Sequence, residues 1–138
     1  MADLSVVAAD VALHSTAGSI TQVTYGATIT QGQALYKDAT DSNKYKLADA
    51  DLSEAAATVA GIALTPGDSG DKGYIVQSGA IDLGVTITVG EIYVLSGNAG
   101  GIAPEADLAT LDYVSIIGVG AAADQLDIKI NNSGIVAA

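Results

Sequence analysis

The sequence predicts an all-β protein: a small barrel or sandwich made of two tandem pseudo-repeats, each with one short helical turn. Two related segments, GATITQGQALYKD and GVTITVGEIYVLS, begin at Gly26 and Gly84, a spacing of 84 − 26 = 58 residues. The chain contains 16 Gly but only two Pro, which favours turns and tight strand ends over long helices. It has six Tyr and no Phe or Trp, so its core must consist of short aliphatic side chains.

The first 25 residues precede both repeats, and we interpret 1–25 as an N-terminal arm followed by a first strand. Segment 4–13 is short and apolar, which is compatible with an extended arm, with a helical turn or with a first core strand of the same domain. Segment 15–25 alternates polar and apolar residues and is rich in β-branched ones, as in a strand.

The first repeat, 26–83, contains a series of short apolar segments separated by polar turns. Its predicted strands are 27–30, 33–38, 44–48, 58–64, 74–78 and 80–84. The intervening 39–43 and 65–73 are rich in Asp, Ser, Gly and Asn, which favour turns. Segment 49–57 places Asp, Ser and Glu before Ala, which predicts one helical turn.

The second repeat, 84–138, has the same order of elements. Its predicted strands are 85–88, 91–96, 113–120 and 125–130, with a turn at 97–101. Segment 104–112 opens with Pro and Glu, which favours a second helical turn. Tyr93 takes the place of Tyr36, and we expect both rings to pack in a core that makes 26–138 one compact domain.

Charge excludes several functional classes. The formal net charge is −11, with 16 acidic residues, five Lys and no Arg, so the chain lacks the cations that nucleic-acid binding requires. An anionic membrane surface would repel it. Because it has no Cys, no disulfide can form. We find no signal peptide and no apolar stretch of the roughly 18 residues that a membrane span needs, and therefore expect synthesis in a cytoplasm.

No catalytic or metal-binding motif is present. The single His, His14, is not accompanied by a G-x-S-x-G sequence, and one His without Cys cannot build a zinc site. The acidic segments 38–43 and 68–73 do not match a calcium-binding loop, although an opportunistic ion there stays open. We therefore expect a protein that is not an enzyme, with no catalytic, cofactor-binding or metal-binding residues and no cofactor.

Three runs of the sequence resemble the small head decoration, or capsid cement, proteins of tailed bacteriophages. They are GATITQGQALYKDATDSNKYKLADADLSEAAATVAGIAL, GYIVQSGAIDLGVTITVGEIYVLSGNAGGIAP and DYVSIIGVG, and the resemblance covers about residues 20–136. The residues that carry it are Gly26, Gly32, Tyr36, Tyr45, Lys46, Leu47, Ala48, Gly61, Ile62, Ala63, Gly84, Gly90, Tyr93, Val94, Leu95, Gly101, Ile102, Ala103, Pro104 and Gly118. They form a pattern of turns and short strands, so no catalytic residue is carried over.

The resemblance implies a structural virion protein on the outer surface of the capsid. Such proteins bind the expanded head and bridge major capsid subunits, often as homotrimers, without a cofactor. Another virion component, such as a head fibre base, a tail-tube protein or a receptor-binding module, is the alternative. An enzyme or a carbohydrate-binding domain is a third hypothesis.

The N-terminal segment supplies the candidate capsid-contact residues. An extended apolar arm can add to the sheet edge of a neighbouring protein and become ordered there. The residues expected to make this contact are Leu4, Val6, Val7, Val11 and Leu13.

Overall fold

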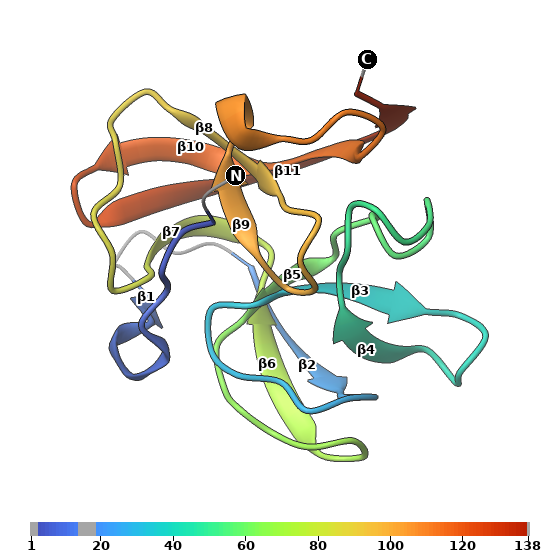
Figure 1. Cartoon of the computed structure of the whole chain (residues 1–138). Coiled ribbons are helices and arrows are strands. Elements are labelled where there is room, and N and C mark those ends of the chain that lie inside the picture. The colour runs from blue at the N-terminus through green and yellow to red at the C-terminus, as the bar shows by residue number, and fades with distance from the viewer. Residues whose placement is uncertain (1–2, 14–18, 138) are drawn as a thin grey trace.

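The computed structural model describes residues 3–13 and 19–137, which form two antiparallel sheets of six and five strands. The sheets lie one above the other in Figure 1, and the described strands do not close into a barrel. The predicted all-β class is therefore confirmed, and a two-sheet arrangement replaces the barrel alternative.

The five-stranded sheet is built from the first half of the chain. Its spatial order is β2-β6-β5-β3-β4, and all its strand pairs are antiparallel. The strands are β2 (Ile20–Thr24), β3 (Ala34–Asp38), β4 (Lys44–Leu47), β5 (Gly61–Ala63) and β6 (Lys72–Val76).

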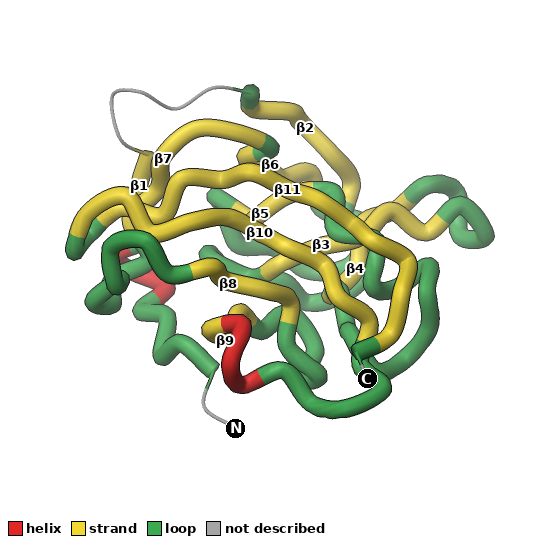
Figure 2. Tube along the Cα trace, turned by 90° about the horizontal axis from the view of Figure 1, so that it is seen from above, coloured by secondary structure: helices red, strands yellow, loops and turns green. Residues whose placement is uncertain are grey.

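The six-stranded sheet takes the second half of the chain and one short strand from the N-terminal segment. Its order is β1-β7-β11-β10-β8-β9, and in Figure 2 β7, β11, β10 and β8 run side by side. The strands are β1 (Ala12–Leu13), β7 (Ser78–Asp82), β8 (Ile92–Leu95), β9 (Ile102–Pro104), β10 (Tyr113–Ala122) and β11 (Gln125–Val136).

The two sheets repeat one topology. The order β2-β6-β5-β3-β4 corresponds strand for strand to β7-β11-β10-β8-β9, and β1 is an addition at the edge beside β7. The repeated unit in the structure thus runs from β2 to β6 and from β7 to β11, so that β7 belongs to the second sheet although it lies within the predicted first copy, 26–83. The chain changes sheet at Gln77, between β6 and β7. The limits 26–83 and 84–138 stay a prediction, since repeated topology alone does not fix where a copy begins.

The predicted helical turns have different outcomes. The second contains a 3₁₀ helix, η2 (Glu105–Asp107). The first is a hydrogen-bonded turn without a helix: the Ala57 amide donates to the Ser53 carbonyl (3.0 Å) and the Ala56 amide to Ser53 Oγ (3.1 Å). A further hydrogen bond runs from the Thr58 amide to the Ala55 carbonyl (3.2 Å), and the hydrogen-bonded turns end there. A further 3₁₀ helix, η1 (Ala8–Asp10), lies in the N-terminal segment.

Two predicted strands are loops with one buried anchor each. Segments 27–30 and 85–88 lie outside the strands of both sheets. Ile29 and Ile87 are nonetheless almost fully buried, and Ile29 forms an isolated bridge with Gly67. The apolar residues that suggested strands therefore fix loops to the core.

One hydrophobic core lies between the sheets. It combines side chains of the five-stranded sheet, such as Ile62 and Val76, with others of the six-stranded sheet, such as Leu126. Tyr93 is buried in this cluster and Tyr36 packs partly buried against it, as predicted.

A second cluster is formed by residues of the five-stranded sheet and its loops, and it includes Tyr25, which the sequence did not single out. Tyr25 is fully buried, with Val23, Leu35 and Ile75 among its neighbours. Its hydroxyl donates to the Thr65 carbonyl (2.6 Å), so the ring carries its polar group into the interior with a partner.

Candidate functional site

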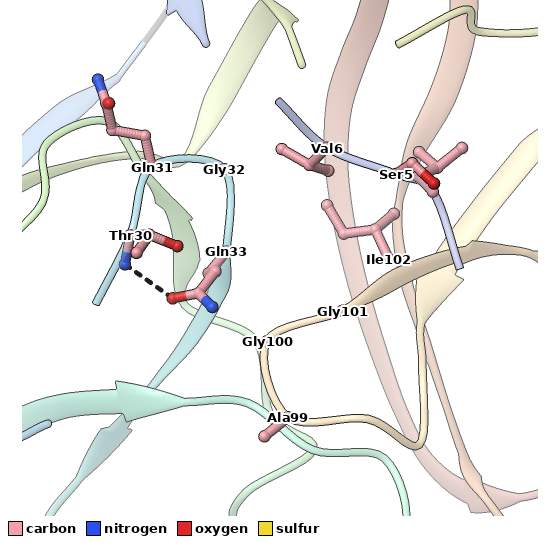
Figure 3. Close-up of a pocket in the computed structure, with 11 residues that line it drawn as sticks. Ser5, Val6, Thr30, Gln31, Gly32, Gln33, Ala99, Gly100, Gly101 and Ile102 are labelled. Atoms are coloured by element: carbon pink, nitrogen blue, oxygen red, sulfur yellow. Dashed lines mark hydrogen bonds between the residues drawn. The ribbon is translucent and has the colours of Figure 1, made fainter. Parts of the chain in front are cut away.

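The structure contains a cavity of about 290 Å³ between the N-terminal segment and two glycine turns, shown in Figure 3. It is lined by Leu4, Ser5, Val6, Thr30, Gln31, Gly32, Gln33, Ala99, Gly100, Gly101 and Ile102. None of these side chains titrates, and the Gln33 amide oxygen already accepts a hydrogen bond from the Thr30 amide (2.8 Å). The cavity can hold a small group or water, but its lining contains no acid or base that could activate the hydroxyl of Ser5 or Thr30. His14 lies outside the described residues.

The N-terminal segment lies on its own domain. The Leu4 amide donates to the Ile102 carbonyl (2.7 Å), and the Val7 amide donates to the Leu83 carbonyl (3.0 Å). Asp3 Oδ2 accepts hydrogen bonds from Ser96 Oγ (2.9 Å) and from Asn98 Nδ2 (3.1 Å). Farther along, β1 pairs with β7. Residues 3–13 therefore follow the surface of the six-stranded sheet as part of the fold.

The five candidate contact residues divide into two groups. Val11 is buried in the core, and Leu4 and Val6 pack partly buried against it. Val7 and Leu13 remain accessible, at 43% and 39% exposure. The alternative interpretation, a segment of the domain's own core, thus fits Leu4, Val6 and Val11. Contact of any of the five with a capsid stays a prediction.

The acidic loops use their carboxylates locally. Asp38 and Asp41 both bind Lys46, at 2.9 and 3.0 Å. Hydrogen bonds from Thr40, together with Lys46, lower the pKa of Asp38 to about 2. In the other loop, Asp71 Oδ2 accepts from the Asp68 amide (2.8 Å). Within 3–13 and 19–137, no group of three His, Cys, Asp or Glu residues has the geometry of a metal site.

The sequence analysis missed an exposed apolar surface at one end of the molecule, which we call the end patch. It comprises Leu52, Leu111, Ile135 and Val136, of which the first three are 69%, 69% and 67% exposed. Backbone hydrogen bonds link the segments on which they lie: the Tyr113 amide donates to the Ala50 carbonyl (2.8 Å), and the Leu111 amide to the Ala137 carbonyl (2.9 Å). In Figure 1 this is the end where β11 finishes above the turn that follows β4. No sequence signal separates these residues from core ones, because both are apolar.

Carboxylates lie beside the end patch. Asp112 is 6% exposed, and its Oδ2 has no hydrogen-bond partner. Burial and the nearby Asp51 raise the pKa of Asp112. Burial, followed by a hydrogen bond shared with Asp51, raises the pKa of Asp49 to about 6. This end of the molecule therefore concentrates carboxyl groups next to exposed apolar side chains.

The comparisons with known proteins add little. No model of a protein family matches the sequence, and no curated protein matches it. Among solved structures, the chain is similar to the N base of the head fibre protein gp8.5 of bacteriophage phi29, with a TM-score of 0.47 and 14% identity over 80% of this chain and 93% of that one. A TM-score below 0.5 does not establish a common fold, so this similarity carries no argument about function. In the described residues, no helix is long and apolar enough to cross a membrane.

Proposed function

We propose that this protein is a structural component of a tailed-phage virion: a decoration, or cement, protein that binds the outside of the expanded head. There it bridges neighbouring major capsid subunits and stabilises the shell, as a homotrimer like many of the proteins it resembles. It acts by contact and not by catalysis.

The observation that carries the proposal is the structural role of the residues behind the resemblance. Gly32 and Gly90 are carriers of it, and both adopt the left-handed backbone conformation, with φ of 87° and 82°. They occupy equivalent turns before β3 and β8, where a side chain would be strained. Two of the glycines on which the resemblance to decoration proteins rests therefore form corresponding corners of the two repeated sheets.

Physical features support a contact role. The lining of the cavity between the N-terminal segment and the glycine turns carries no titratable group. The two sheets pack on a shared core, and such a packed domain suits a protein that holds two neighbouring capsid subunits in a fixed relative position. The net charge of −11 opposes nonspecific aggregation and directs binding toward cationic surfaces.

A sedimentation experiment tests the proposal. The purified protein is mixed with expanded heads that lack it, prepared from the phage that encodes it, and bound protein is measured after pelleting. We expect saturable binding, with added density on the outer surface in cryo-electron microscopy. Absence of binding to expanded heads would overturn the proposal. Attachment to host cells instead would identify a receptor-binding module, and recovery only in tails would identify a tail component.

A further inference from the structure

We propose that the end patch is the surface through which this protein docks on the shell, and that it meets a protein surface with an apolar centre and a rim of Lys or Arg. This inference rests on the proposed function and names the contact chemistry of the partner. The patch is formed by the turn after β4, the turn before β10 and the end of β11, three segments that lie far apart in the sequence.

The backbone conformation of Leu111 is the first observation that supports contact of the end patch with another protein. Leu111 has φ of 72°, a left-handed conformation that Gly and Asn adopt readily and Leu does not. Its side chain is 69% exposed, so it gains little from the core. A strained backbone that presents an exposed apolar side chain is typical of a contact site.

Charge identifies the partner. Asp51 and Glu54 are exposed in the turn that carries Leu52. The Glu54 carboxylate lies beside Gly134, the residue before Ile135: a Cβ placed on Gly134 would be 2.7 Å from Glu54 Oε2. Among the described residues, the ion pairs of Lys46 and Lys129 involve other carboxylates. The ion pairs of the described residues therefore leave the acidic rim without a cation, and the rim complements a cationic rim on another protein.

The same charges argue against other occupants. A second copy placed patch to patch would bring the exposed carboxylates of Asp51 and Glu54 against their equivalents, which is repulsive. An anionic lipid surface would be repelled in the same way. A cationic protein surface with an apolar centre is the occupant that satisfies both parts of the patch.

The test removes the apolar side chains without disturbing the fold. The double variant Leu111→Asn/Ile135→Thr puts a residue that tolerates positive φ at 111 and keeps a β-branched residue in β11. The matched control is Val89→Thr, since Val89 is 66% exposed in a turn outside the patch. We expect all three proteins to have similar melting temperatures. In sedimentation with expanded heads, the double variant should bind about tenfold more weakly or worse, and the control like wild type.

A charge reversal tests the rim. Glu54→Lys should weaken binding to heads, and wild-type binding should fall as salt is raised. If a folded double variant binds heads like wild type, the inference is wrong while the proposed function stands. If wild type binds no heads, both fail. If the double variant instead changes the oligomeric state in sedimentation equilibrium, the patch joins copies of this chain and the inference is overturned.

Discussion

The side chain of Asn132 and the backbone of Val59 form a pair of hydrogen bonds that connects the two sheets. The Val59 amide donates to Asn132 Oδ1 (2.9 Å), and Asn132 Nδ2 donates to the Val59 carbonyl (3.1 Å). Asn132 lies on β11, and Val59 lies two residues before the first residue of β5, Gly61. Because sheets that lie face to face share no ladder, the side-chain amide supplies the backbone-like pairing that this junction otherwise lacks.

Replacing Asn132 by Asp should destabilise the fold. The change removes the donor to the Val59 carbonyl and sets a carboxylate against it, so we expect a loss of about 2 kcal/mol in the free energy of unfolding. Denaturant titration measures it. The control is Asn131→Asp, which adds the same charge at an exposed neighbouring position. Equal losses in both variants would assign the effect to net charge and not to the hydrogen-bond pair.

Gly73 and Tyr25 should show strong coupling. A Cβ on Gly73 would collide with the Tyr25 ring, so Gly73→Ala should cost on the order of 2 kcal/mol or more. Tyr25→Ala should cost about 3–5 kcal/mol through the cavity it leaves. In the double variant the added methyl enters that cavity, so the combined loss should be clearly smaller than the sum. Additive losses in thermal and denaturant unfolding would show that the ring does not restrict position 73.

The pKa of Asp49 predicts a pH dependence of stability. Its pKa rises from 3.8 to about 6 on folding. Between these two pH values the folded state therefore holds a proton that the unfolded state has released. The stability that this group contributes is therefore present below pH 3.8 and is lost as the pH rises through about 6.

Asp49→Asn should raise the melting temperature at pH 7 by a few degrees and change it little at pH 4. Asn keeps an oxygen that can accept the hydrogen bond from the Asp51 amide (3.2 Å). An exposed carboxyl elsewhere, in Glu105→Gln, serves as the control and should show no such difference between the two pH values. A gain for Asp49→Asn that is equal at both pH values would contradict the assigned pKa.

Deleting residues 3–13 should destabilise the domain. Val11 fills the core, and the turn at Gly32 leaves space that Val6 and Val11 occupy, so removing them exposes apolar surface. We expect a clearly lower melting temperature in calorimetry. Val7→Ser and Leu13→Ser, which change the exposed side chains only, should keep the stability of wild type. A truncated protein as stable as wild type would restore the interpretation of the segment as a separate arm.

The sequence was sufficient to predict an all-β fold with a repeated order of elements, because glycine turns and β-branched segments recur at a nearly constant spacing. It did not predict the order of the strands in the sheets. It also located Tyr93 and Tyr36 against the shared core. These features depend on local patterns, which a sequence displays directly.

The remaining features depend on which segments meet in space. Asn132 occurs in the polar run NNSG and gives no sign of a partner 73 residues away. Val11 and Leu52 are both apolar residues in the sequence, yet one is buried and the other is 69% exposed. Burial at such positions is decided by the opposite sheet, so the end patch and the docked N-terminal segment required the structure.

The connection between β5 and β6 differs in length from its counterpart in the second sheet. Residues 64–71 join β5 to β6, whereas β10 and β11 are joined by Ala123 and Asp124 alone. The repeated topology therefore needs only a tight hairpin at this point. The tip of the longer loop reaches solvent: Ser69 and Gly70 are exposed, and a Cβ on Gly70 would meet nothing within 4 Å, although the Gly70 amide donates to the Tyr25 carbonyl (2.8 Å). A foreign peptide inserted between these two residues would project into solvent, and on a shell decorated with this protein it would be displayed as a dense, regular array of epitopes.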